Sequence, residues 1–525
     1  MNRQLDNHIF KNIQSGFFIA LLAMPLSLGI ASASSFPPIA GLITAIVAGI
    51  VCSHLAGCKL SIKGPAAGLI VIVMATVNDL GQGDVVLGYK RALAVGVVAA
   101  LCQILLALFK TAKFGKIMPP SVIHGMLAAI GVIIIAKQSH ILLGNIPSGK
   151  TPFELLSEIP NSIMHANPEL LFIGLITIFC MVLLPKNNNR IIKTIPPALA
   201  ALLIVVPLSI VWHLHDAHSY TLFGYDFNVG PEFLINIPHS LLDSLVWPDF
   251  SILQQAIAYK YVAMLALVGS LESVLTVIAV DSITQTKKES DLNKDLLAIG
   301  VGNLISSLLG GLPMISEVVR SKANIDSKAS NKWSAFFHGL FLLIAVVFFG
   351  DLLREIPLSA LAAMLIMVGF KLAAPSQIKH AKSIGIDQLL MFCTTLLVTL
   401  AEDLLIGVMA GLLVKVIFHL SRGLTIKDFF ILKSKITHTD EQTIIEVTRA
   451  LVFSNSLQLQ NLLNKELNNS KKVILDVSQV NIIDHTTMIC LKNFLSKFTA
   501  EKLQITGLIK LKPVSNHCLA THKTA

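Results

Sequence analysis

A chain of 525 residues in which 54% are hydrophobic and only 14% are charged departs from soluble globular domains, where about 25% are charged. Its apolar residues gather in runs of about 18 or more, the length at which a helix spans a bilayer. This excludes an ordinary soluble enzyme. The formal net charge of +10 is ascribed to basic residues in short cytoplasmic loops and not to nucleic-acid binding.

Hydrophobic segments joined at turn signals predict about fourteen transmembrane helices, given a spanning length of about 20 residues. No cleavage site followed by a soluble mature chain comes after the first segment, so it is interpreted as a retained helix and not as a signal peptide. In chain order the predicted segments cover residues 12–33, 38–57, 64–78, 87–109, 119–137, 167–185, 195–213, 257–281, 295–310, 315–326, 333–350, 357–372, 385–402 and 403–421.

The third and the tenth segments are unusually short and follow Gly/Pro breaks. The third opens with "IKGPAAGLIVIV" at Ile62, and the tenth belongs to "GGLPMISEVVRSKAN", which begins at Gly310. Interrupted segments at equivalent places in two halves are typical of transporters built from inverted repeats. The loops agree with this count, because lysines such as Lys110, Lys113 and Lys116 fall in cytoplasmic loops when the N-terminus is cytoplasmic.

Beyond about Arg422 the composition becomes that of a soluble domain. "QTIIEVTRALVFSN" predicts two short strands, "KKVILDVSQV" a buried strand and "KLQITGLIKL" a last strand, with helices in "LQLQNLLNKELNN" and "HTTMICLKNFLSKF". The sequence therefore predicts a transmembrane domain over residues 1–425 and a small cytoplasmic α/β domain over 436–525. The Lys/Thr-containing tail is expected to be unstructured.

The two Gly/Pro breaks predict a binding site for an anion. A helix that begins within the membrane has unpaired N–H groups and the positive end of its dipole at its N-terminus, and two such ends facing each other attract negative charge. Arg320 adds a cation with forked donors. The candidate residues at the two breaks are Gly64, Pro65, Ala66, Ala67, Ser316 and Arg320. The alternative is two kinked helices packed through small residues, with Arg320 extending to the cytoplasmic surface.

Glu272 is a carboxylate in the middle of the eighth segment, in "LVGSLESVLTVIAVD", and Thr276 follows one turn later on the same face. A carboxylate at that depth can carry a proton, or it can bind a cation together with Thr276 and backbone carbonyls. The alternative is a packing role, in which Glu272 bonds to a neighbouring helix. Catalytic and metal-binding motifs are absent, so no enzyme activity, metal or cofactor is expected, apart from Na+ as the alternative coupling ion.

These motifs resemble those of a known family. The "GP" break, "LESVLT", "GVGNLISSLLGGLP" and the Arg and Asn that follow are similar to the SulP (sulfate permease) inorganic anion transporters, in a bacterial bicarbonate/sulfate-type branch. "VILDVSQVNIIDHTTM" is similar to the core of their cytoplasmic STAS domain. The resemblance implies an all-α polytopic membrane protein with a 7+7 inverted repeat, split into core and gate domains, plus a short STAS domain. It also implies a homodimer and an elevator-like movement of the core. Separately from the resemblance, the loop charges and the even number of spans predict that both termini are cytoplasmic, and a bacterial inner membrane is expected.

The resemblance also implies roles for particular residues. The family's anion site falls at Ala66 and its neighbours and at Ser316, Glu317 and Arg320, and its coupling carboxylate falls at Glu272. The loop after Asp484 often carries a phosphorylatable serine in STAS domains. Here Thr486 and Thr487 follow Asp484 and become candidate regulatory residues.

Three residues depart from the family pattern: Ala66 replaces a polar residue, Glu317 a small or hydroxyl residue, and Lys63 a Ser or Thr. We hypothesise that Lys63 and Glu317 form an ion pair across the facing half-helices, which leaves Arg320 available for the substrate. The alternative is that Lys63 extends to the cytoplasm while Glu317 pairs with Arg320, three residues along.

The sequence thus predicts a secondary active transporter of a small inorganic anion, with bicarbonate slightly ahead of sulfate, coupled to H+ or Na+. A sulfate or dicarboxylate proton symporter or anion exchanger is the nearest alternative. From another class, the chain could be a membrane signalling protein whose output is the STAS domain, which would need neither Glu272 nor Arg320.

Overall fold

The computed structural model describes residues 2–147, 149, 151–186, 195–222, 225–238, 244–284, 289–439, 441–470 and 472–524. Within these ranges the chain forms two compact units. The first comprises residues 1–112 and 130–371, and the second comprises residues 113–129 and 372–525. One long helix, α6 (Pro120–Leu142), contributes residues to both units.

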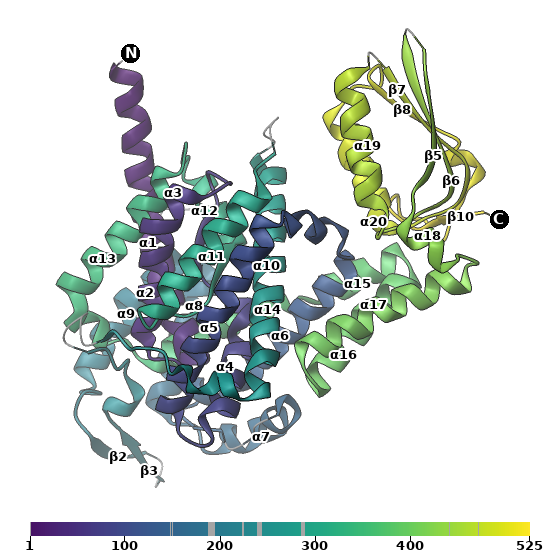
Figure 1. The fold of residues 1–525 in the computed structure, drawn as a ribbon. Coiled ribbons are helices and arrows are strands. Elements are labelled where there is room, and N and C mark those ends of the chain that lie inside the picture. The colour runs from purple at the N-terminus through teal and green to yellow at the C-terminus, as the bar shows by residue number, and fades with distance from the viewer. Residues whose placement is uncertain are drawn as a thin grey trace. The chain divides into compact units, whose positions relative to one another are not determined.

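The first unit is almost entirely helical (Figure 1). Its helices, apart from α6, are α1 (Asn2–Ala33), α2 (Pro38–Val47), α3 (Ser53–Leu55), α4 (Ile70–Gly81), α5 (Val85–Leu108), α7 (Pro152–Met164), α8 (Pro168–Leu183), α9 (Pro197–Val211), α10 (Ala256–Thr284), α11 (Leu292–Leu308), α12 (Val318–Asp326), α13 (Trp333–Arg354) and α14 (Leu358–Leu372). Its strands are β1 (Ile62–Pro65), β2 (His218–Leu222), β3 (Tyr225–Val229) and β4 (Met314–Glu317).

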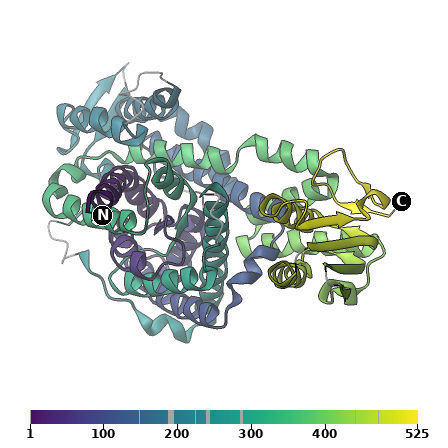
Figure 2. The same cartoon turned by 90° about the horizontal axis from the view of Figure 1, so that it is seen from above.

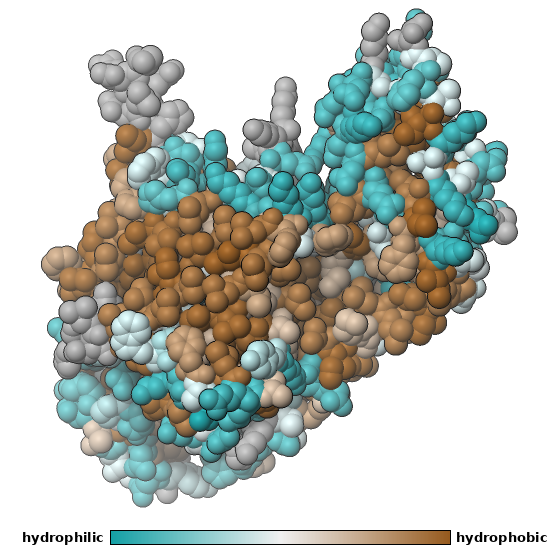
Figure 3. Space-filling view, viewed as in Figure 1, coloured by the Kyte–Doolittle hydropathy of each residue, from teal (hydrophilic) through white to brown (hydrophobic). Residues whose placement is uncertain are grey.

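The helices confirm a polytopic membrane fold. Every segment predicted from the sequence overlaps a helix, and nine helices in the described ranges are long and apolar enough to cross a membrane. In Figure 2 many helices of the first unit are seen nearly end-on. Figure 3 shows a broad hydrophobic band on the viewer's side of this unit, with hydrophilic residues above and below it. That distribution is typical of a protein whose middle contacts lipid hydrocarbon.

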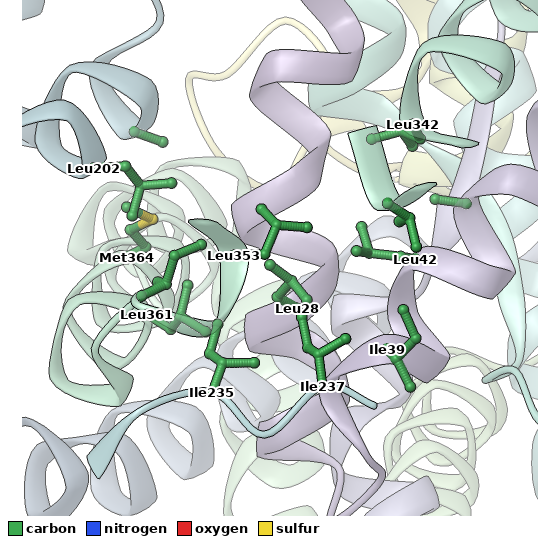
Figure 4. Close-up of a cluster of buried hydrophobic side chains, with 14 of the residues drawn as sticks. Leu28, Ile39, Leu42, Leu202, Ile235, Ile237, Leu342, Leu353, Leu361 and Met364 are labelled. Carbon is green, nitrogen blue, oxygen red and sulfur yellow. The ribbon is translucent and has the colours of Figure 1, made fainter. Parts of the chain in front are cut away.

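A single apolar cluster holds much of the first unit together. Figure 4 shows Leu28 of α1 beside Leu353 of α13, with Leu42 of α2 on one side of them and Leu361 and Met364 of α14 on the other. All five side chains are almost completely buried. Because these helices lie far apart in sequence, the cluster joins the two halves of the chain.

The helices begin where the sequence supplies caps. Asp84 accepts hydrogen bonds from the first turn of α5, and Asp291 does the same for α11. Proline stands in the first turn of α2, α8 and α9, where a missing N–H costs nothing. The sequence prediction missed α7, because its residues are too polar and too few to resemble a membrane span.

Strands β1 and β4 form a two-stranded antiparallel ladder, in which Lys63 lies opposite Ser316 and Pro65 opposite Met314. The third and tenth predicted segments therefore each begin as a strand and continue as a helix. The half-helices start later than predicted, α4 at Ile70 after a 3₁₀ turn over Ala67–Leu69, and α12 at Val318. The backbone N–H and C=O groups of each strand form hydrogen bonds with those of the other strand. Non-helical backbone that is buried away from water needs such partners.

The second unit combines apolar helices with an α/β domain. Its elements are α15 (Pro375–Ile384), α16 (Ile386–Ala401), α17 (Leu404–Ser421), α18 (Ile426–Phe430), β5 (Lys433–His438), β6 (Gln442–Leu451), α19 (Ser456–Asn469), β7 (Lys472–Ile483), α20 (His485–Lys497), β8 (Leu503–Thr506), β9 (Lys512–Pro513) and β10 (His522–Lys523). The sheet order is β5-β6-β7-β10-β9, and β8 also pairs with β7.

Two predictions for the α/β domain are wrong. "QTIIEVTRALVFSN" contains one continuous strand, β6, because β5 and β7 pair along its length. The tail is ordered near its end, where His522 and Lys523 form β10 against Ile483 and Ile482 of β7. Strand β10 is two residues long and both residues are polar, so no alternation of apolar and polar residues marks it in the sequence.

Candidate functional site

The ladder of β1 and β4 is fastened by a buried ion pair. Lys63 Nζ lies 2.9 Å from Asp295 Oδ1 on α11, and both side chains are 2% exposed. The same carboxylate accepts a hydrogen bond from Ser316 Oγ at 3.1 Å and one from the Cys58 backbone N–H at 3.0 Å. Asp295 therefore joins both strands to α11 and has its charge neutralised by Lys63.

This pair corrects the hypothesis of an ion pair between Lys63 and Glu317. Lys63 is 3% exposed and bonds to Asp295, so it neither pairs with Glu317 nor extends to the surface. The register explains the difference, because Ile62 and not Lys63 lies opposite Glu317. Ser316 also differs from its predicted role, since its hydroxyl donates to Asp295 and is occupied.

Three other charged groups meet on the short backbone segment between Gly64 and Gly68. The Arg320 guanidinium lies against Gly64, so closely that a Cβ there would collide with Nη1. The Glu272 carboxylate lies against Gly68 in the same way. Both close approaches require glycine, because any side chain would displace the charged group.

Glu317 completes this group. Its carboxylate reaches the backbone N–H of Ala67, at the start of the helical turn that leads into α4. The Glu317 carboxylate from the end of β4, the Arg320 guanidinium from α12 and the Glu272 carboxylate from α10 therefore lie on the β1–α4 connection. The structure brings together the predicted residues of the third, eighth and tenth segments.

The atoms of these groups lack protein partners. In the described part of the chain, Glu272 Oε1, Glu317 Oε1 and both terminal nitrogens of Arg320 are buried without a hydrogen bond. Arg320 is 1% exposed and Glu272 is 7% exposed. Buried polar atoms are almost always paired in native proteins, so a cluster of unpaired ones indicates a place where something else binds.

The remaining predicted residues line the same region. Pro65 and Ala66 are buried in and just after β1, and Ala67 is partly exposed. Ala66 has an extended backbone and its own side chain provides no cap, so among the N–H groups that follow it the one of Ala67 is reached by Glu317 from the other half-helix. Thr276 is buried one turn beyond Glu272 on α10.

Sequence reasoning missed the residues that hold β4 in place. The Asn303 side chain on α11 accepts from the Met314 N–H at 2.6 Å, donates to the Met314 carbonyl at 3.1 Å, and donates to Gln103 on α5 at 2.8 Å. A signal was present, because Gln103, Asp295 and Asn303 are polar residues inside predicted apolar segments.

The candidate regulatory residues of the α/β domain lie in a second buried charge cluster. Asp484 caps α20 by accepting from the Thr487 N–H, and it pairs with Lys415 Nζ of α17 at 2.9 Å. His419 Nε2 of α17 lies 3.5 Å from the same carboxylate, and Lys415 Nζ also donates to Thr486 Oγ1 at 2.8 Å. Thr486 is 7% exposed and Thr487 is fully buried, so neither hydroxyl is open to a kinase in this conformation.

The ion pair dominates the chemistry of Asp484. Burial alone would raise the pKa of this carboxyl, but Lys415 and the hydrogen bonds around it hold the pKa well below its usual range. A lowered pKa in the folded state contributes stability above about pH 4, and this contribution is lost as the pH falls further. The contact between α17 and α20 is therefore expected to weaken in acid.

We expect Lys415→Met to loosen α20. The substitution removes the cation and leaves Asp484 buried with His419, its cap and the Phe453 N–H as partners, which costs about 1–3 kcal/mol for an incompletely satisfied group. Amide hydrogen exchange of α20 in the full chain should accelerate by roughly the corresponding factor of 5 to 150. Lys427→Met, at an exposed position of α18, is the matched control. Equal exchange in both variants would show that the pair does not hold the helix.

The chain is similar over most of its length to known membrane proteins. The model of the sulfate permease family matches residues 9–395, and that of the STAS domain matches residues 433–514. A putative sulfate transporter of Bacillus subtilis, YvdB, is 24% identical over 510 residues, which is 95% of this chain and 91% of that protein. The bicarbonate transporter BicA of Synechocystis is 27% identical over 425 residues, 80% of this chain and 72% of that protein.

Solved structures agree on the fold. The transmembrane domain of a cyanobacterial bicarbonate transporter BicA has a TM-score of 0.64 at 24% identity, and covers 77% of this chain and 97% of that one. The structure of SLC26A9 has a TM-score of 0.68 at 15% identity, and covers 95% of this chain and 84% of that one. With its apolar helices, its paired half-helices and its C-terminal α/β domain, the chain is an integral membrane protein of the sulfate permease family that carries a STAS domain.

Proposed function

We propose that the chain is a secondary active transporter of a small inorganic oxyanion, with bicarbonate ahead of sulfate. The observation that carries the proposal is the meeting of unpaired Arg320 with the uncapped start of α4. A buried guanidinium with free donors next to a helix N-terminus is a strong attractor for an anion. The names of the relatives, which include sulfate and bicarbonate transporters, support the same substrate class.

Coupling is proposed to run through Glu272. Its unpaired carboxylate lies on the same short backbone segment as the proposed anion site, so its charge state affects anion binding directly. It either takes up a proton with the anion or, together with Thr276, binds Na+. In both cases a cation removes the repulsion between Glu272 and the substrate.

The proposed transport movement is elevator-like. The ladder of β1 and β4 joins the beginnings of both half-helices, and Asp295 fastens the ladder to α11. These links favour displacement of the site as one body over separate bending of two helices. We further propose a homodimer in a bacterial inner membrane, with both termini in the cytoplasm.

Uptake into proteoliposomes tests the proposal. The purified full chain should accumulate labelled bicarbonate or sulfate when an inward H+ or Na+ gradient is imposed, and the two gradients applied separately identify the coupling ion. Electroneutral exchange without a gradient would indicate an anion exchanger, and accumulation of a dicarboxylate would change the substrate. Absence of uptake for every anion would contradict the transporter and favour a signalling role for the STAS domain.

We expect Glu272→Gln to separate exchange from accumulation. The neutral amide resembles the protonated carboxyl, so the anion still binds, but no cation is released or taken up with it. In a 1:1 symport a difference of one pH unit across the membrane supports about a tenfold anion gradient. In Glu272→Gln the internal anion concentration should fall to the level reached without coupling. Exchange of internal for external anion should persist.

The matched control for that experiment is Glu232→Gln, which neutralises an exposed carboxylate. It should accumulate the anion like the unaltered protein. If Glu272→Gln still accumulates the anion against its gradient, coupling does not pass through Glu272.

A further inference from the structure

The proposed site contains a second carboxylate that coupling does not require. Glu272 provides one titratable acid, and Lys63 is neutralised by Asp295, so neither explains why Glu317 stands next to Arg320. A carboxylate inside an anion site repels every fully deprotonated anion. Its presence therefore needs a reason in the chemistry of the ligand, and the inference drawn from it rests on the proposed function.

The position of Glu317 indicates that it faces the ligand. It stands at the N-cap of α12, where an acid usually accepts from its own helix, but its side chain makes no such capping bond. The carboxylate instead reaches across the strand pair to the Ala67 N–H at the start of the other half-helix. Its second oxygen, Oε1, is buried and has no partner in the described chain.

The charges around Glu317 come from several elements. Arg320 lies one turn away on the same helix, and Glu272 reaches the neighbouring residue Gly68 from α10. His338 of α13 is fully buried near Arg320 and lacks hydrogen bonds within the described ranges. The pair of Lys63 and Asp295 lies behind the ladder and cancels its own charge. Arg320 is thus the cation that faces the two acids.

An ionised carboxylate can only accept hydrogen bonds, whereas the guanidinium and backbone N–H groups can only donate them. Fully deprotonated oxyanions such as sulfate and nitrate offer acceptors alone. Bicarbonate offers acceptor oxygens and also one O–H donor. A site with donors on one side and an unpaired acceptor on the other complements the second kind of anion.

We propose that Glu317 accepts the O–H of the substrate and so selects hydrogen-bearing oxyanions, of which bicarbonate is the example. Arg320 and the N–H groups at the start of α4 bind the charged oxygens of the same ion. An anion without a hydrogen leaves the Glu317 carboxylate unpaired and repelled. Sites built to bond a substrate hydroxyl reject analogues that lack it by as much as about 10⁴-fold.

Nitrate provides a sharp test, because it matches bicarbonate in planar shape and single charge but has no hydrogen. In proteoliposomes containing the full chain, unlabelled bicarbonate should compete with labelled bicarbonate at least about 100 times better than nitrate or sulfate. This comparison needs no substitution, so it stands even if a variant fails to fold.

Substitutions then assign the preference to Glu317. Glu317→Gln adds an N–H donor at the same place, and should lower the ratio of kcat/KM for bicarbonate to that for nitrate by about 100-fold. Glu317→Asp keeps a carboxylate and should keep the order of preference. Elution volume and thermal midpoint of each variant in detergent report whether it is folded.

Each remaining outcome is decisive. If the unaltered protein takes up sulfate or nitrate as well as bicarbonate, the inference is overturned while the proposed transporter stands. The inference is also overturned if Glu317→Gln is folded and still prefers bicarbonate to nitrate. It is overturned as well if the only change in Glu317→Gln is that uptake no longer depends on Na+, because Glu317 would then be a cation ligand. Failure of the unaltered protein to take up any anion overturns the proposed function itself.

Discussion

Replacing Arg320 by glutamine is expected to lower the initial rate of anion uptake by about 100-fold or more. Two terminal nitrogens of this guanidinium are buried without protein partners, so their hydrogen bonds are available to the substrate. Hydrogen bonds to charged groups contribute about 1.5–3 kcal/mol each, and the loss of two corresponds to at least a 100-fold change. Uptake of labelled bicarbonate into proteoliposomes at subsaturating concentration measures the effect.

The matched control is Lys322→Gln, which removes an exposed cation two residues along the same helix and should leave uptake nearly unchanged. Arg320→Lys should recover part of the rate, because it restores the charge but not the forked donors. Uptake by Arg320→Gln within threefold of the unaltered protein would place the anion elsewhere.

Lys63→Met is expected to destabilise the first unit by about 3–5 kcal/mol, because it leaves the Asp295 carboxylate buried without a cation. The thermal midpoint of the purified protein in detergent should fall, and less folded protein should reach the membrane. The combined Lys63→Met and Asp295→Asn variant should regain more than half of the loss, since the amide oxygen can still accept from the Cys58 N–H and the amide NH₂ can donate to the Ser316 hydroxyl oxygen.

Lys59→Met provides the comparison, because Lys59 lies on the same stretch of chain but is exposed. It should unfold at the same temperature as the unaltered protein. If Lys63→Met also does so, the pair with Asp295 is not what fastens the ladder.

Most of the fold could be predicted from hydrophobic segments alone. Long apolar runs such as that of α5 leave no alternative to a helix in a bilayer, and every predicted segment overlaps one. The Gly/Pro breaks at Gly64 and Pro313 identified the two interrupted segments, because those residues are disfavoured within a helix. Nothing in the sequence patterns distinguished the four-residue strands from the first turn of a helix.

The partners of individual charges could not be predicted. Lys63 was assigned to Glu317 because both depart from the family pattern, but the register of β1 and β4 sets which side chains meet. Asp295 lies 232 residues from Lys63, and a single sequence contains no information on such a contact. The close approach of Glu272 to Gly68 likewise depends on helix packing, although both residues were visible as unusual features.

The ladder of β1 and β4 has a consequence for how the protein is made. A ribosome delivers Lys63 and the strand around it long before it delivers Asp295 and β4. Until then the backbone of β1 has no strand partner and the lysine has no counter-ion, so neither can enter hydrocarbon without a large penalty. The third segment must therefore wait in contact with water or with the insertion machinery, and the biogenesis of the N-terminal half is completed only when the C-terminal half arrives.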